Sequence, residues 1–137
     1  LVPEMMRQGW GRIINIASLQ SSRAFPNGLP YGASKGGIAQ LTRGMAEAWS
    51  RPGAGITANA IAPGFFSGKQ NAALLWNPDG TPTARTKKIL AATPMGRFGQ
   101  AEELLGALLF LLNNEAASFV TGVVIPVDGG FSAYSGV

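Results

Sequence analysis

Three short apolar runs, separated by stretches with helical periodicity, constrain the fold of this chain most strongly. The first, Arg12-Ile-Ile-Asn-Ile-Ala17, is flanked by Gly11 and a serine-rich loop. The others are Ile56-Thr-Ala-Asn-Ala-Ile61 and the segment from Val120 to Val127. Short continuous apolar runs are typical of parallel strands that are covered on both faces. Because such runs alternate with helices along the chain, the sequence predicts an α/β fold with about three parallel strands and flanking helices.

The longest predicted helix spans residues 30 to 50. Pro30 suits its first turn, and Pro52-Gly53 ends it. One flank carries small residues that allow close packing against both a sheet and a twin helix. These are Gly32, Ala33, Gly36, Gly37 and Ala39, and a second flank carries Leu41, Met45 and Trp49. We therefore expect a homodimer or homotetramer that pairs through this helix.

The remaining predicted elements are shorter. Leu1 to Gln8 is interpreted as the last turns of a helix, and Glu102 to Leu112 as a final amphipathic helix. Residues 64 to 93 are predicted to hold two short helices separated by the turn Asn77-Pro-Asp-Gly80. A long irregular segment inside a compact α/β unit is usually functional, so this one is predicted to be a substrate loop.

Composition excludes several classes of function. The 137 residues carry a net charge of +4 with scattered cations, which argues against a nucleic-acid partner. The absence of Cys and His removes disulfides and the commonest metal ligands, so no metal site is expected. No segment has the length of a membrane span, and we expect a cytoplasmic protein. With 46% hydrophobic and only 13% charged residues, some apolar surface is expected to be covered by further chain or by a partner.

The candidate chemistry lies in Ser18 and in the pair Tyr31 and Lys35. On a helix, positions 31 and 35 share one face one turn apart, so an ammonium can lie beside a phenol. A neighbouring positive charge favours a phenolate, which is acid/base chemistry. Ser18 ends the first strand and can donate a hydrogen bond to a substrate oxygen. Taken singly, Tyr31 with Lys35 is equally typical of a surface aromatic beside a solvated lysine, and Ser18 of a residue that ends a strand.

The combination of these residues resembles the short-chain dehydrogenase/reductase family. It consists of the strand serine, the Tyr/Lys helix and a strand ending in Asn59-Ala-Ile-Ala-Pro63-Gly64, followed by Pro94-Met-Gly-Arg97 and Val127-Asp-Gly-Gly130. The resemblance implies a doubly wound Rossmann fold. The glycine-rich turn with which that family binds the dinucleotide pyrophosphate is not found in this sequence. We therefore expect residues 1–137 to be the C-terminal half of a single Rossmann-type domain, without its N-terminal nucleotide-binding half.

The resemblance also implies a role for each residue. Ser18 would polarise a substrate carbonyl, Tyr31 would exchange the hydroxyl proton, and Lys35 would bind the nicotinamide ribose. The cofactor would be NAD or NADP, between which this sequence does not distinguish. Besides Tyr31 and Lys35, the cofactor residues would be Pro63, Gly64 and Phe66.

The implied reaction is the interconversion of a hydroxyl and a carbonyl on a small polar substrate. The C-terminal segments resemble the branch that contains gluconate 5-dehydrogenases and mannonate/fructuronate oxidoreductases, which indicates a sugar acid. Its carboxylate needs a cation and its hydroxyls need hydrogen-bond partners. The candidate substrate residues are Ser18, Gln20 and Arg23, with Asn27 and Lys69 in neighbouring loops.

Two other functions are compatible with these residues. The chain could be a cofactor-free stub that acts only as an assembly module through helix 30–50. It could also be a hydrolase that uses Ser18 with the Tyr31/Lys35 pair as its base, although Asn15-Ile-Ala-Ser-Leu is not the Gly-x-Ser-x-Gly turn of such enzymes. Asn59 is predicted to bind neighbouring backbone instead of substrate, and Asp128-Gly129-Gly130 is predicted to close a turn instead of taking part in catalysis.

The first strand supports a separate prediction about the 137 residues on their own. In a complete sheet we expect residues 12 to 17 to be central. In this chain alone the strand would form an edge beside exposed apolar surface. We therefore predict that the isolated chain binds no dinucleotide and associates through this edge.

Overall fold

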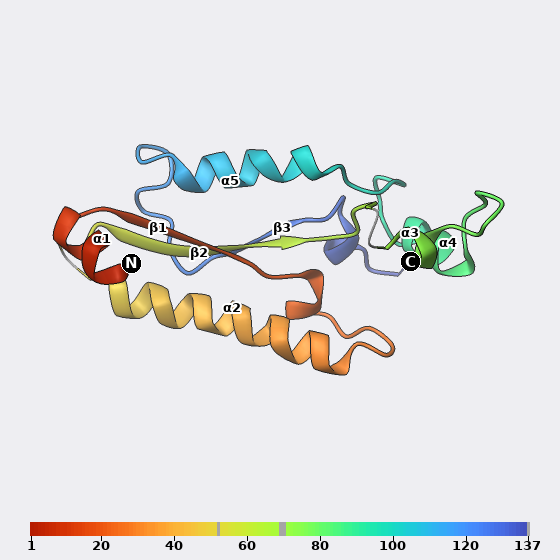
Figure 1. Cartoon of the computed structure of the whole chain (residues 1–137), viewed down its shortest axis with the longest axis horizontal. Helices are drawn as coiled ribbons and strands as arrows, with labels where there is room; N and C mark the ends of the chain where they lie inside the picture. Colours follow the sequence, from red (N-terminus) through yellow and green to blue (C-terminus); the bar gives the residue numbers. More distant parts are fainter. Residues whose placement is uncertain (52, 69–70, 137) are drawn as a thin grey trace.

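The computed structural model describes residues 1–51, 53–68 and 71–136. Its strands form one layer between two helical layers (Figure 1). The helices and strands, in chain order, are α1 (Val2–Gln8), β1 (Gly11–Ile16), α2 (Leu29–Trp49), β2 (Ile56–Pro63), α3 (Ala72–Leu75), α4 (Ala84–Ala91), α5 (Leu105–Leu112) and β3 (Val124–Val127). Short 3-10 turns occupy Leu19–Ser21, Ala101–Leu104 and Phe131–Ala133. The predicted α/β class with three strands and flanking helices is confirmed.

The sheet is parallel, with strand order β1-β2-β3. Its register pairs Gly11 with Ile56 between β1 and β2, and Ala60 with Val124 between β2 and β3. Helix α2 covers one face and α5 the other (Figure 1). β2 is central and buried along nearly its whole length, whereas β1 is an edge strand whose residue Ile16 is 53% exposed. The prediction that the first strand is an edge in this chain is therefore confirmed.

Helix α2 approaches the sheet closely because small residues meet at the contact. Ala39, Thr42 and Ala46 are its buried positions, and they face a strand that contains Ala58, Ala60 and Ala62. Thr42, fully buried, donates a hydrogen bond from Oγ1 to the Ile38 carbonyl at 2.8 Å. The same oxygen accepts from Asn15 Nδ2 of β1 at 3.0 Å. The packing of α2 on the sheet thus leaves no polar group of Thr42 unpaired.

The last strand is shorter than expected, since only Val124–Val127 of the predicted 120–127 pairs in the ladder. Residues 120 to 123 are held beside β2 by backbone hydrogen bonds at Gly122 and Val123 and, in addition, by side chains. Asn59 Nδ2 donates to the Val120 carbonyl at 2.9 Å, and the Val123 amide donates to Asn59 Oδ1 at 3.1 Å. Thr121 Oγ1 accepts from the Ala58 amide. The prediction that Asn59 bonds neighbouring backbone is confirmed.

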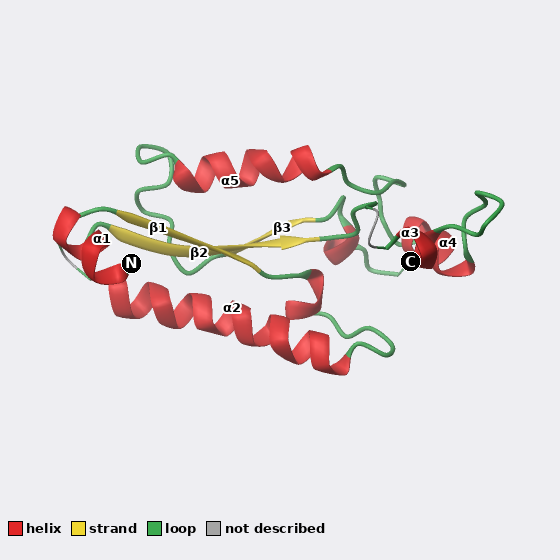
Figure 2. Cartoon of the chain, viewed as in Figure 1, coloured by secondary structure: helices red, strands yellow, loops and turns green. Residues whose placement is uncertain are grey.

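Helices α3 and α4 lie beyond the carboxyl ends of the strands (Figure 2). They have a small core of their own, formed by Leu75, Ile89 and Phe98 with Phe65 and Leu90 packed against it. Thr86 is fully buried and donates a hydrogen bond to the Leu75 carbonyl at 2.6 Å, which ties α4 to α3. The two predicted short helices and the turn between them are confirmed.

Helix α5 differs from its prediction at its start and on its outer face. Ala101–Leu104 forms a 3-10 turn, and the α-helix begins at Leu105. Its residues Leu105-Gly-Ala-Leu-Leu-Phe-Leu-Leu112 contain nothing polar, so Leu105 and Leu109 lie exposed at 49% and 63%. The helix is therefore apolar all round instead of amphipathic. Among the described residues, no helix is long and apolar enough to cross a membrane.

Candidate functional site

Tyr31 and Lys35 lie in the first two turns of α2, at the carboxyl end of β1. Lys35 Nζ is 5.8 Å from the centroid of the Tyr31 ring. It donates a hydrogen bond to the carbonyl oxygen of Ile16, the last residue of β1, at 2.8 Å. Tyr31 is 49% exposed. The structure thus brings the predicted pair together and fixes the ammonium against the strand, while the phenol faces outward.

The 3-10 turn Leu19–Ser21, which Ser18 caps, is hydrogen-bonded to α2. Ser21 Oγ donates to the Lys35 carbonyl at 2.8 Å, and the Ser18 amide donates to Ser21 Oγ at 3.2 Å. Ser18 Oγ accepts from the Gln20 amide at 3.2 Å as the N-cap of the 3-10 turn. Ser18 lines a small cavity between α2 and the sheet that Tyr31 does not line. Within the described residues, Ser18 is therefore near Lys35 through its turn, and no hydrogen bond joins its hydroxyl to Tyr31.

Pro63 is the last residue of β2, and Gly64 and Phe66 follow it. The Gly64 amide donates to the Val127 carbonyl at 2.9 Å. A Cβ at Gly64 would lie 2.6 Å from Asp128 Cα, so the close approach of the two chain segments requires glycine here. Asp128 binds the Gly130 and Ser132 amides at 2.9 and 2.8 Å, which confirms its predicted role in a turn.

Phe66 lines a cavity of about 600 Å³ beside this turn. The cavity is also lined by Arg97 and Glu103, which form a two-pronged ion pair at 2.8 and 2.6 Å. The Arg97 guanidinium beside Glu103, together with the Gln100 amide, lowers the pKa of that carboxyl from 4.5 to about 2. This pair fixes the loop that follows Pro94 against the start of the 3-10 turn before α5.

A second cavity, of about 570 Å³, lies beside Tyr31, and we call it the Tyr31 pocket. Its walls come from the loop before α2, from α4, and from the segments that follow β2 and β3. The lining residues are Gln20, Phe25, Pro26, Asn27, Gly28, Tyr31, Phe65, Ala84, Arg85, Lys88, Ile89 and Phe131. A cavity of this size suits a small-molecule ligand.

Three phenylalanines form one wall of the Tyr31 pocket. Phe65 lies edge-on to Phe25 and to Phe131, with ring centroids 5.8 and 5.1 Å apart. Phe25 and Phe131 are stacked at 5.7 Å. Each ring comes from a different loop, so this cluster joins the loop before α2, the segment after β2 and the last 3-10 turn.

The predicted substrate residues are placed unequally. Gln20 and Asn27 line the Tyr31 pocket. Gln20 packs its carboxamide against Gly28, and its buried Oε1 has no hydrogen-bond partner among the described atoms. Arg23 lines a different cavity, and its guanidinium donates to the Ser132 carbonyl. Lys69 lies outside the described residues.

Sequence reasoning missed Arg85 and Lys88, the two cations of the Tyr31 pocket. Their spacing on the predicted second helix of the substrate loop would have placed them on one face. The cavity that this face borders depends on contacts between distant segments. Among the described residues, no cluster of three or more acidic, His or Cys side chains could hold a metal ion.

Comparison with known proteins gives these residues a context. The family model described as enoyl-(acyl carrier protein) reductase matches residues 1–132. The chain belongs to the short-chain dehydrogenase/reductase family. This confirms the resemblance that the serine strand, the Tyr/Lys helix and the Pro63-Gly64 strand end carried.

Individual relatives are similar over nearly the whole chain. An uncharacterised oxidoreductase of Haemophilus influenzae is 50% identical over 98% of this chain and 46% of its own length. The gluconate 5-dehydrogenase of Gluconobacter oxydans is 43% identical over 93% of this chain and 47% of its own length. The chain thus spans about half the length of the curated relatives that it matches.

Two solved structures match the fold. A candidate D-mannonate oxidoreductase from Haemophilus influenza with bound NAD has a TM-score of 0.86 and 52% identity, covering 92% of this chain and 44% of that one. A gluconate 5-dehydrogenase from Burkholderia cenocepacia in complex with NADP and tartrate has a TM-score of 0.84 and 41% identity, covering 96% and 48%. Each match covers less than half of the solved chain, which is consistent with part of a Rossmann fold.

Proposed function

We propose that the protein containing these residues is an NAD(P)-dependent oxidoreductase that interconverts a hydroxyl and a carbonyl on a sugar acid. One observation carries the proposal: the Tyr31 phenol borders a ligand-sized pocket while Lys35, beside its ring, is fixed to the end of β1. Relatives named for gluconate 5-dehydrogenase and mannonate oxidation support the substrate class. The relatives crystallised with NAD and NADP support either cofactor.

Each predicted residue then has a role. Tyr31 exchanges the proton of the reacting hydroxyl, because it is the exposed acid/base group of the pocket. Lys35 places a positive charge beside the Tyr31 ring. Ser18 donates a hydrogen bond to the substrate oxygen, for which its hydroxyl proton is available because Ser18 Oγ accepts from the Gln20 amide.

The residues of this chain also fit the nicotinamide end of a dinucleotide. The exposed phenol and the ammonium offer partners for ribose hydroxyls, and the carboxyl ends of parallel strands are where α/β folds bind ligands. Tyr31, Lys35, Pro63, Gly64 and Phe66 would hold this end. When bound, the nicotinamide supplies or accepts the hydride. Residues 1–137 are then the C-terminal half of one Rossmann-type domain, in an enzyme that we place in the cytoplasm.

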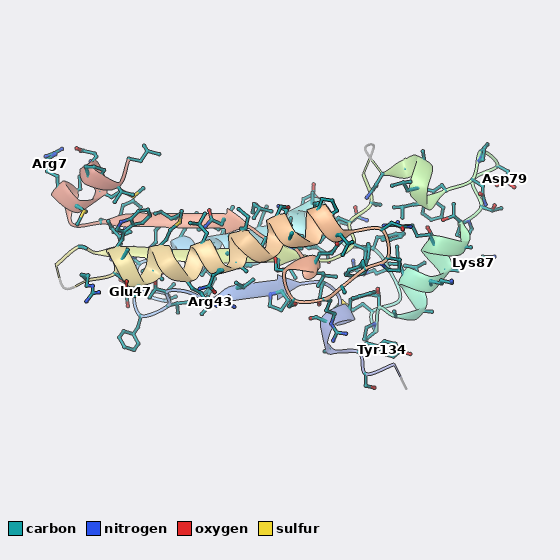
Figure 3. The ribbon with its side chains drawn as sticks, turned by 90° about the horizontal axis from the view of Figure 1, so that it is seen from below. Arg7, Arg43, Glu47, Asp79, Lys87 and Tyr134 are labelled. Carbon is teal, nitrogen blue, oxygen red and sulfur yellow. The ribbon has the colours of Figure 1, made fainter. Side chains whose placement is uncertain are left out.

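A catalytic assay tests this function in the full-length protein. Tyr31→Phe removes only the hydroxyl, so we expect a loss of NAD(P)-dependent oxidation of D-gluconate or D-mannonate of about 10²- to 10⁴-fold, with cofactor binding retained. Tyr134→Phe is the matched control, since these are the two tyrosines of the sequence and Tyr134 lies near the C-terminal end (Figure 3). Wild-type turnover by the Tyr31→Phe enzyme would show that the acid/base assignment is wrong.

Helix α2 supports a proposal about assembly. Its outward face carries Gly37, Leu41, Gly44 and Ala48, all exposed, with Leu41 at 49%. Small residues around one exposed leucine suit a close two-fold contact with a second copy of the helix. We expect light scattering to report a homodimer or homotetramer at micromolar concentration and Leu41→Lys to reduce the assembly. A wild-type monomer would count against it.

A further inference from the structure

We propose that Arg85 and Lys88 of α4 bind the carboxylate of the substrate in the Tyr31 pocket, and so select acids over neutral polyols. The inference rests on the proposed function and adds the residues that recognise the charged end of the substrate. Arg85, Lys88 and Tyr31 line one cavity of about 570 Å³, so a single small molecule can contact the phenol and the cations together.

Arg85 and Lys88 lie on the face of α4 that borders this cavity. They are one helical turn apart, and residues with this spacing share a face. Thr83 caps the helix by accepting the Thr86 amide at 3.2 Å, and Ile89, also a lining residue, is buried in the small core beneath. Arg85 and Lys88 therefore project from a helix whose position is fixed by the Thr83 cap and by the packing of Ile89.

Arg85 and Lys88 differ from most of the described cationic side chains in their lack of a hydrogen-bond or ion-pair partner. Arg7, Arg51 and Arg97 pair with carboxylates, and the remaining described cations outside α4 donate hydrogen bonds to carbonyl or amide oxygens. In the described part of the chain, the three cations of α4 alone have no hydrogen bond or ion pair to protein. Among the described residues that line the Tyr31 pocket, none carries a carboxylate. Two of these three free cations, Arg85 and Lys88, therefore border one cavity with no acidic side chain among its described lining residues.

The alternative cation, Arg23, is already engaged. Its guanidinium donates to the Ser132 carbonyl, and it borders a cavity that Tyr31 does not line. Arg85 offers a planar fork that matches a carboxylate with two hydrogen bonds, and Lys88 adds a second positive charge. The structure thus favours Arg85 and Lys88 over Arg23 as the partners of the substrate carboxylate.

Equilibrium binding tests the proposal without requiring turnover. Full-length protein saturated with NADH or NADPH is titrated calorimetrically with D-gluconate and D-mannonate, since the reduced cofactor leaves these hydroxy acids unreacted. For the best-bound acid, we expect Arg85→Gln/Lys88→Gln to weaken binding by about 10- to 100-fold, as expected for loss of hydrogen bonds between charged groups. Sorbitol, a neutral polyol, should bind the wild type and this variant equally weakly.

Lys87→Gln is the matched control. Lys87 belongs to the same helix and carries the same charge, but it does not line the pocket and points away from the rest of the molecule (Figure 3). Its substitution should change acid binding less than about twofold. Equal weakening by Lys87→Gln would reveal a general effect of charge and overturn the site, as would wild-type affinity in the double variant. Circular dichroism and the single Lys88→Gln variant separate a binding defect from a folding defect.

The proposal and the proposed function fail in different ways. If the wild type oxidises the acid and the double variant binds it normally, the carboxylate site is wrong and the oxidoreductase assignment stands. If the acid binds through Arg85 and Lys88 but no nicotinamide-dependent oxidation or reduction occurs, the reaction is wrong and the site stands. If the wild type binds neither acid, the carboxylate site is rejected.

Discussion

Helix α2 packs on the sheet through Ala39, Thr42 and Ala46, against a strand that is buried along nearly its whole length. Helix α4 buries only Thr86 and Ile89, and it leaves its cations exposed. The proposed acid/base pair, Tyr31 and Lys35, lies on α2, and the free cations of the Tyr31 pocket lie on α4.

This difference separates two requirements of an enzyme. A proton-transferring group must be held within a fraction of an ångström, which suits a helix locked by close packing on the sheet. A group that recognises one end of a substrate can lie on an element with its own small core. Cations on α4 can then be exchanged with little disturbance of the sheet, so substrate choice and chemistry can vary independently.

The largest effect is expected at the turn that joins α2 to β2. Gly55 has a φ of +62°, and a Cβ there would lie 1.9 Å from the Gly9 carbonyl oxygen, which is backbone and cannot move aside freely. We expect Gly55→Ala to destabilise the fold by more than about 3 kcal/mol, measured by urea denaturation. Gly53→Ala is the control for backbone strain alone, because Gly53 also has a positive φ but open space around it. Its cost should be about 1 kcal/mol. Similar losses in the two variants would contradict the role of the contact with Gly9.

Two buried threonines allow a direct comparison of the helices. Thr42→Val deprives Asn15 Nδ2 of its 3.0 Å acceptor between α2 and β1, and should lower global stability by about 1 to 3 kcal/mol. Thr86→Val removes one of the two donors of the Leu75 carbonyl, which keeps the Thr83 amide at 3.0 Å, and should increase hydrogen exchange mainly in residues 72 to 91. If Thr86→Val instead raised exchange throughout the sheet, α4 would be part of the same cooperative unit as α2.

The smallest effect concerns the exposed ion pair of Arg97 and Glu103. Because the pKa of Glu103 is lowered from 4.5 to about 2 in the folded protein, its ionised form stabilises the fold above pH 4.5. This contribution is lost as the pH falls from 4.5 toward 2. Glu103→Gln should therefore reduce the acid sensitivity of the melting temperature in that window. An unchanged pH profile would show that the pair does not contribute.

Local pattern was enough to predict β1, α2 and the two short helices, since apolar runs, Pro30 and the Asn77–Gly80 turn act within their own segments. It overestimated the last strand, because residues 120 to 123 are held beside β2 partly by the side chains of Asn59 and Thr121 and not by a regular ladder. The Tyr31–Lys35 pair could be predicted from helical spacing. The cations of α4 and the phenylalanine cluster could not, because they reach the Tyr31 pocket only through contacts between distant segments.

The central claim is that α2 supplies the proton-transferring group and α4 binds the substrate carboxylate. A crystal structure of the full-length protein with its reduced cofactor and the best-bound sugar acid tests this claim most directly. We expect the reacting hydroxyl within hydrogen-bond distance of the Tyr31 phenol and the carboxylate within hydrogen-bond distance of Arg85 and Lys88. A carboxylate bound by Arg23, or a reacting hydroxyl away from Tyr31, would contradict the account.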